Sequence, residues 1–224
     1  MRRRRPVRVR RVRFRGAAPA ARPAPDVPRI AGADAKDQLR MLADEQTALR
    51  RVAELVARGT PPEQLFDAVA VAAAGLVGED TTLMRLDGER TFTIVATCGG
   101  SAPPGTRIDV PVTDQGVAAE ILRTRRPARL DDYGSRPGPA YARDDYGVRS
   151  AAGVPILVDG RIWGVLGATT EGRRPPDTTE YRLAQFAGLV AAALANAQAR
   201  TDLQRLADEQ SALRAVAELV ARGV

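Results

Sequence analysis

Two segments of the chain, residues 36–59 and 189–220, place apolar side chains at alternating steps of three and four. This spacing puts the apolar positions on one stripe of a helix and is typical of a left-handed coiled coil. We therefore predict two long helices that join like chains into a homodimer. The predicted seam positions are Leu39, Leu42, Gln46, Leu49, Ala53 and Val56 in the first helix, and Leu189, Ala192, Asn196, Ala199, Leu203, Leu206, Gln210, Leu213, Ala217 and Val220 in the second.

The two predicted helices share nearly one sequence. Residues 42–59 read LADEQTALRRVAELVARG and residues 206–223 read LADEQSALRAVAELVARG, so sixteen of eighteen positions match at an offset of 164 residues. Because this offset exceeds one solenoid unit, each copy is expected to precede a whole globular domain, and the chain is expected to end where a second domain would begin. The repeat favours pairing between chains, although a helix packed on its own domain would carry a similar apolar stripe.

The segment between the copies begins with a predicted helix. Gly59 is expected to end the first linker helix, because glycine readily adopts the positive φ of a helix C-terminus. Thr60 is expected to cap the next helix and Pro61 to be its first residue, with the helix running to about Val77. Its predicted buried residues are Leu65, Phe66, Val69 and either Leu76 or Val77.

From Thr81 onward the apolar period changes to two, which predicts β-strands. Asp87-Gly88 and Asp159-Gly160 are expected to form two-residue hairpin turns, and the more apolar second hairpin is expected at the sheet centre. A short helix is predicted from Asp114, and residues 133–148 are predicted to be a long loop. The expected fold class is α+β, an antiparallel sheet with the terminal helices on one face.

Four regions follow from these patterns: a disordered tail rich in Arg, Pro and Ala at residues 1–35, a linker helix at 36–59, the domain at 60–200, and a second linker helix at 201–224. The net charge of +7 is concentrated in the tail, where residues 1–30 hold eleven Arg and one acid. The remaining residues are mildly acidic and predict no basic face for nucleic acid.

The Arg run at the N-terminus has several interpretations. A solvated tail is favoured, since the run has one aromatic residue, Phe14, and so offers no aromatic platform for bases to stack on. A DNA-associated regulator that uses this arm, an anionic-membrane arm and a rarely translated extension remain alternatives. No apolar window is long enough to span a membrane, and no apolar h-region follows the arginines as in a secretory signal.

The residue types present restrict the chemistry. The chain has one cysteine, Cys98, and no histidine, which excludes an intrachain disulfide, a thiolate metal cluster, imidazole bases and a phospho-accepting histidine. The acid pairs Asp131-Asp132 and Asp144-Asp145 are interpreted as solvated loop acids, because no third ligand type or nucleophile accompanies them. We therefore predict that the chain is not an enzyme and holds no metal.

Two strings carry a family resemblance: PVTDQGVAAEILRTRRPARLDDY at residues 111–133 and RSAAGVPILVDGRIWGVLGATT at residues 149–170. Together with the order of elements, they resemble a GAF domain of the kind found in multi-GAF actinobacterial sensor histidine kinases. The duplicated helix is similar to the linker that precedes each GAF module in such proteins. The resemblance covers about residues 40–224.

The resemblance implies a cytoplasmic sensory module of a two-component signalling protein. A small ligand would bind between the sheet and the irregular segment that covers it, and paired linker helices would relay the signal to a downstream kinase or output domain. The expected ligand residues are Tyr133, Tyr141, Tyr146, Arg149 and Trp163. A ligand-free dimerisation and relay module is the alternative, in which these side chains only fill the core.

The family also limits the ligand, although it leaves any cofactor unknown. Bilin attachment in related photosensors uses a cysteine, usually beside a histidine that this chain lacks, so Cys98 is interpreted as an incidental thiol, with redox sensing as the alternative. The signature of cyclic-nucleotide-binding members is not found, since AGLV follows Phe186 in place of acids. A related methionine sulfoxide reductase uses several cysteines, which argues against that activity here.

Overall fold

The computed structural model describes residues 32–99, 102–134, 147–172 and 174–221. Its centre is a six-stranded antiparallel sheet in the order β3-β2-β1-β6-β5-β4. The strands are β1 (Asp80–Leu86), β2 (Thr91–Cys98), β3 (Arg107–Asp109), β4 (Ala128–Leu130), β5 (Ser150–Val158) and β6 (Arg161–Thr170).

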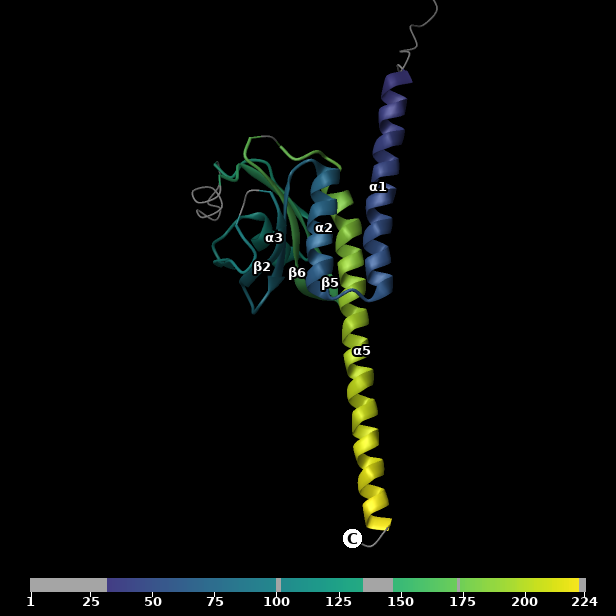
Figure 1. Cartoon of the computed structure of the whole chain (residues 1–224). Coiled ribbons are helices and arrows are strands. Elements are labelled where there is room, and N and C mark those ends of the chain that lie inside the picture. The colour runs from purple at the N-terminus through teal and green to yellow at the C-terminus, as the bar shows by residue number, and fades with distance from the viewer. Residues whose placement is uncertain (1–31, 100–101, 135–146, 173, 222–224) are drawn as a thin grey trace, which may run out of the picture.

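Helices cover both faces of this sheet. Figure 1 shows α1 (Gly32–Arg58), α2 (Pro62–Val77) and the first part of α5 (Thr179–Ala221) on one face, and α3 (Val117–Thr124) on the other. We call these the long-helix face and the α3 face. The expected α+β class is confirmed. None of the described helices combines the length and apolarity needed to cross a bilayer.

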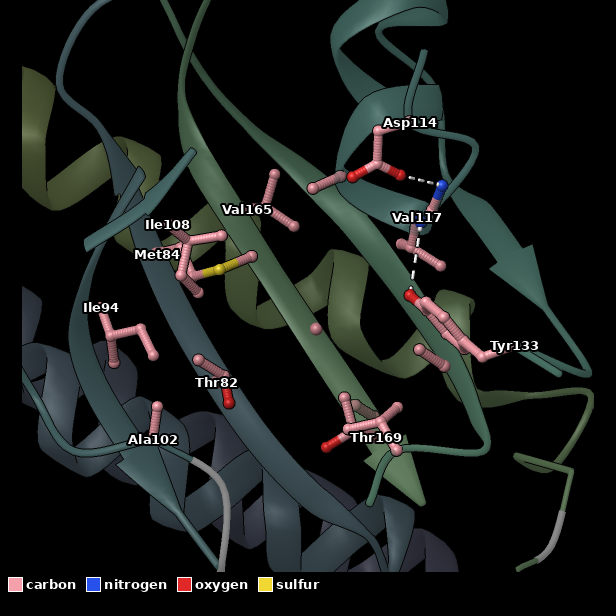
Figure 2. Close-up of a pocket in the computed structure, with 17 residues that line it drawn as sticks. Thr82, Met84, Ile94, Ala102, Ile108, Asp114, Val117, Tyr133, Val165 and Thr169 are labelled. Atoms are coloured by element: carbon pink, nitrogen blue, oxygen red, sulfur yellow. Dashed lines mark hydrogen bonds between the residues drawn. The ribbon is translucent and has the colours of Figure 1, made fainter. Parts of the chain in front are cut away.

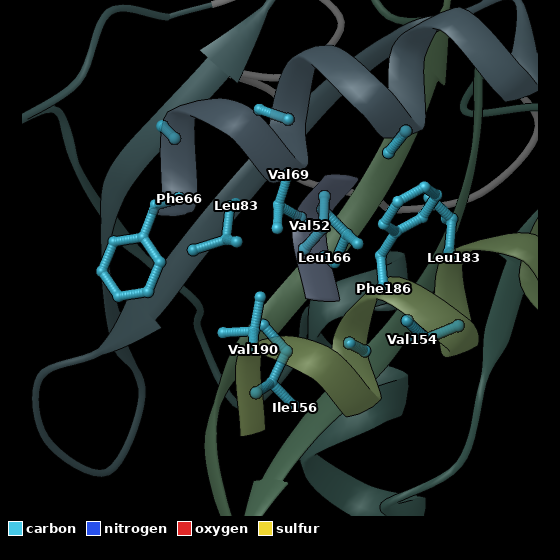
Figure 3. Close-up of a cluster of buried hydrophobic side chains, with 14 of the residues drawn as sticks. Val52, Phe66, Val69, Leu83, Val154, Ile156, Leu166, Leu183, Phe186 and Val190 are labelled. Atoms are coloured by element: carbon cyan, nitrogen blue, oxygen red, sulfur yellow. The ribbon is translucent and has the colours of Figure 1, made fainter. Parts of the chain in front are cut away.

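The larger core lies under the long helices. Figure 3 shows Phe66 and Val69 of α2 facing strand residues such as Leu83, with Phe186 and Val190 of α5 closing the cluster. Phe66 also lies against Trp163, at a ring-centroid distance of 5.2 Å. The period of the helix was enough to predict these α2 positions, because one helix face must be buried whatever covers it.

The two hairpins differ in their turns. Asp159 and Gly160 have φ of 50° and 72°, so the second turn has two residues, as Asp-Gly predicts. The first turn is longer than predicted and spans residues 87–90, because β2 begins only at Thr91. Beside this turn, the Asp87 carboxylate accepts hydrogen bonds from Arg85, at 2.6 Å, and from Thr93.

The start of α2 also corrects a prediction. Pro61 is the N-cap and Pro62 the first helical residue, and no side-chain hydrogen bond caps the helix. Thr60 is therefore not the cap. Pro62 explains the shift, since a residue before proline avoids the helical region, which leaves Pro61 extended at ψ 141°. Gly59 ends α1 with φ of 67°, as predicted.

The two copies of the repeated sequence lie in different surroundings. The second half of α1 packs on the domain, and its most buried residue, Val52 at 1% exposure, is not a predicted seam position. The copy in α5 extends beyond the domain, and Leu206 and Leu213 are 55% and 70% exposed. Packing on its own domain, the alternative interpretation, thus describes α1 but not the far half of α5. Pairing between chains stays a prediction.

Candidate functional site

An apolar cavity of about 100 Å³ lies on the α3 face of the sheet. Figure 2 shows it between strands of the sheet and the segment that leads into α3. The lining residues from the strands are Thr82, Met84, Ile94, Ile108, Ala151, Ala152, Val165, Gly167, Ala168 and Thr169, and those from other segments are Ala102, Asp114, Gly116, Val117, Ala118, Tyr133 and Val148.

One end of the cavity carries polar groups held by the start of α3. Asp114 accepts a hydrogen bond from the Gly116 amide at 2.5 Å, which fixes the backbone just before the helix. The amide of Val117 points to the Tyr133 hydroxyl, with an N to O distance of 3.5 Å. A carboxylate and a phenol therefore accept hydrogen bonds from amides at the start of α3, which have no carbonyl partner within the helix.

Burial changes the acidity of both side chains. It raises the pKa of Tyr133 to about 12, because the phenolate would lose its hydration in this apolar surrounding. Burial also raises the pKa of Asp114, although the hydrogen bond from Gly116 acts in the opposite direction. The phenol thus stays neutral at physiological pH and can donate its proton to a ligand, while Asp114 offers an acceptor.

Two threonines lie toward the other end of the cavity. Thr82 of β1 is buried and Thr169 of β6 is partly buried, and both line the cavity far from Asp114 in Figure 2. Between the two ends the walls are apolar. This distribution suits a small molecule that is mostly apolar with one polar group at the α3 end.

The expected ligand residues fall in different places. Tyr133 lines the cavity, and its contact with a ligand stays a prediction. Arg149 has an exposed side chain and does not line it; its backbone bridges Tyr133 and Thr170, with both hydrogen bonds at 2.8 Å. Trp163 packs on Phe66 on the long-helix face, so the sheet separates it from the cavity. Tyr141 and Tyr146 lie outside the described residues.

Several lining residues were not expected as ligand residues. Asp114 was predicted only as a helix cap, and its Asp-Gln-Gly context in front of a helix was the available signal. Thr82 and Thr169 belong to strands whose two faces are both covered, so their period of two does not indicate which face holds a cavity.

The other candidate groups have structural roles. Cys98 ends β2 and packs against the long-helix core, away from the cavity. Asp131 pairs with Arg174 at 3.0 Å, and Asp132 accepts a hydrogen bond from the Gly134 amide at 2.7 Å. Within the described residues, no cluster of three acids or cysteines could hold a metal ion. Asp144 and Asp145 lie outside that part of the chain.

A protein-family model described as the GAF domain matches residues 61–197. No curated protein sequence matches the chain.

Solved structures share the fold at low identity. The GAF domain of a phosphoenolpyruvate-protein phosphotransferase from Coxiella burnetii has a TM-score of 0.59 at 18% identity, with 71% of this chain and 98% of that chain covered. A phycoerythrobilin-bound GAF domain from a cyanobacterial phytochrome has a TM-score of 0.58 at 15% identity, with 70% and 97% covered. Free methionine-R-sulfoxide reductase from Neisseria meningitidis, in complex with its substrate, has a TM-score of 0.57 at 22% identity, with 69% and 91% covered.

Proposed function

The chain belongs to the GAF domain family, a family of small-ligand-binding signalling modules, and we propose that it is a sensor whose ligand occupies the cavity on the α3 face. The observation that carries this proposal is the pairing of an apolar cavity with a buried phenol and a partly buried carboxylate at one end. Asp114 and Tyr133 would orient the polar group of a ligand, and the apolar walls would bind the rest of it.

The size of the cavity limits the ligand. An apolar cavity of roughly 150 Å³ binds benzene or xenon in another protein, so a cavity of this order accommodates a small molecule. A tetrapyrrole or a nucleotide is several times larger than the space that the described residues enclose. We therefore propose a compact ligand with one hydrogen-bonding group, and no covalent attachment through Cys98, which packs on the other face.

The signal would leave the domain through α5. This helix contributes Phe186 and Val190 to the core and then continues beyond the domain. Exposed leucines at seam spacing, Leu203, Leu206 and Leu213, support pairing with the α5 of a second chain. A ligand would shift the paired α5 helices from one arrangement to another only if it binds the two arrangements with different affinities. A downstream output domain, such as the kinase of a two-component protein, would read the shift.

A binding role is also favoured over catalysis. Among the described residues, the polar groups at the cavity are a carboxyl, a phenol and two threonine hydroxyls, and the threonines lie at the end away from the carboxylate that would have to activate them. The reductase that shares the fold is an enzyme by its printed description, but the single cysteine of this chain lies outside the cavity.

Native mass spectrometry of the chain purified from the organism that makes it tests the sensor proposal. A reproducible mass increase of one small molecule, lost on denaturation, is the expected result. As a second measurement, benzene would be titrated into the isotope-labelled chain and followed by NMR. The proposal predicts shifts confined to the cavity residues. An empty protein whose cavity signals do not respond to benzene would contradict it and favour the ligand-free relay module.

A further inference from the structure

The face that α1 buries on its own domain is defined by a few specific contacts. Val52 is 1% exposed, and Glu45 pairs with Arg182 of α5 at 3.5 Å. Glu45 also accepts a hydrogen bond from Gln185 at 3.3 Å. Both partners of the ion pair are largely buried, at 13% and 16% side-chain exposure. The remaining contacts of α1 with the core come from Ala48, Leu49, Leu55 and Val56.

Every one of these contact residues recurs in the second copy. Glu45 corresponds to Glu209 and Val52 to Val216, at the constant offset of the repeat. The other four correspond to Ala212, Leu213, Leu219 and Val220. The two positions that differ between the copies, Thr47 and Arg51, have exposed side chains in α1. The α1 residues that pack on the core or pair with α5 are therefore all retained in the second copy, while Arg51, at the edge of the groove between α1 and α2, is replaced by Ala215.

Among the described side chains of the second copy, none packs on a surface of its own domain. Glu209 and Ala212 are exposed, and Leu213 is 70% exposed. The chain thus presents two helices with the same docking face and one surface, formed by α2 and the first part of α5, that fits it. We propose that residues 206–221 of one chain dock on the α2 and α5 surface of a second copy, in the place that α1 occupies.

The direction of the helices determines what this exchange builds. Glu45 lies near Arg182, and Gly59 lies near Arg200, so α1 and α5 run in parallel. A docked Glu209 would take the place of Glu45 beside Arg182 of the other chain. In the chain that supplies Glu209, Arg182 lies 27 residues before Glu209, which is roughly 40 Å along a helix with a rise of 1.5 Å per residue. The association is therefore head to tail and adds chains one after another.

The intrachain helix competes with this exchange. Because a short loop tethers α1 to α2, its effective concentration at the surface is high, and the exchanged form increases when α1 is weakened. This docking goes beyond ligand sensing and does not depend on the cavity. It differs from pairing of α5 helices, which gives a closed dimer with like residues opposite one another.

Thiol cross-linking of full-length chains tests the exchange. In a Cys98→Ser background, one chain carries Gln185→Cys and the other carries Gln210→Cys. Gln210 corresponds to Gln46, which lies beside Gln185 in the same surface groove between α1 and α5. After mixing, a short bis-maleimide reagent should link the two different chains. Adding Glu45→Gln to the chain that carries Gln185→Cys should raise the yield severalfold, because it weakens α1.

Two controls make the outcome decisive. Ser211→Cys replaces Gln210→Cys in the first control. Its counterpart Thr47 does not line the groove that holds Gln46 and Gln185, so the yield should fall severalfold. The second control is the Gln210→Cys chain by itself, which links to itself if α5 helices pair along the predicted seam. Links of Gln210→Cys only to itself, or equal yields with Ser211→Cys, would overturn the docking proposal and leave the cavity proposal untouched.

Discussion

Arg129 of β4 and Glu180 in the first turn of α5 form a two-pronged ion pair. Nε of Arg129 donates to Glu180 at 2.6 Å, and a second guanidinium nitrogen donates to the other carboxylate oxygen. Arg129 also donates to the carbonyls of Pro175 and Pro176, at 2.5 and 2.7 Å. The edge strand packed against α3 is thereby tied to the start of the helix that leaves the domain.

The first prediction concerns this pair. Glu180→Gln should lower the free energy of unfolding at pH 7 by about 1–2 kcal/mol, because a charged hydrogen bond is replaced by a neutral one. Asp177→Asn is the matched control. Asp177 is 81% exposed and 3.9 Å from Arg129, so its loss should cost less than about 0.5 kcal/mol. Urea unfolding of the three proteins provides the comparison.

The same pair predicts a pH dependence. Burial would raise the pKa of Glu180, but the hydrogen bond and charge of Arg129 outweigh it and lower the pKa below 4.5. The contribution of the pair is therefore fully present above pH 4.5 and is lost as the pH falls through the folded-state pKa. The difference between wild type and Glu180→Gln should shrink in acid. A difference that stays constant down to pH 3 would contradict this.

The docking of α1 gives a second prediction. Val52→Ala should destabilise the protein by about 1–3 kcal/mol, since it leaves a cavity at a site that is 1% exposed. Val71→Ala on α2 deletes the same atoms from a residue that is 60% exposed and should cost less than about 0.5 kcal/mol. Equal losses in thermal unfolding would mean that α1 is not packed on its domain in solution.

Close approach of β1 and β6 gives a third prediction. A Cβ at Gly164 would lie 2.1 Å from the carbonyl oxygen of Met84, and a backbone atom in a central strand pair cannot move aside. Gly164→Ala should therefore cost about 3 kcal/mol or more, or prevent folding. Gly167→Ala in the same strand meets only ordinary contacts, the nearest at 3.7 Å, and should remain folded within about 1 kcal/mol of wild type.

The cavity gives a fourth prediction. Ala118→Leu on α3 should fill it and abolish the benzene-dependent NMR shifts without unfolding the domain, because the added atoms occupy empty space. Ala43→Leu on the exposed part of α1 adds the same atoms at a distance from the cavity and should leave binding unchanged. Binding that survives Ala118→Leu would locate benzene elsewhere.

The exposed half of α5 gives a fifth prediction. If α5 helices pair along the seam, Leu206→Glu should weaken association of the full-length chain at least about tenfold, which corresponds to about 1.4 kcal/mol. The off-seam change Ser211→Glu should have little effect. Leu206 corresponds to Leu42, which stays 58% exposed when α1 is docked, so this substitution spares the head-to-tail contact. Sedimentation equilibrium measures the mass, and a monomer at every concentration would contradict both kinds of association.

The sequence by itself determined the elements and several of their ends. The 3.6-residue and two-residue periods located α2, β5 and β6. Gly59 and the Asp159-Gly160 turn were predictable because a positive φ is a local property that few residues accept. Tyr133 was expected at the pocket only through the family resemblance, which implies a ligand between the sheet and the irregular segment that contains this residue.

Only the tertiary structure decided which side of each element is buried and what lies against it. Trp163 and Val165 are two residues apart in β6, yet Trp163 lies under the long helices and Val165 lines the cavity, because the pairing of β6 with β5 shifts register between Ile162 and Gly164. In α1 the predicted coiled-coil seam and the face that packs on the domain overlap. Val52 is buried because the surface formed by α2 and α5 covers that face. Burial depends on partners distant in sequence, and two identical segments therefore have different surroundings in one chain.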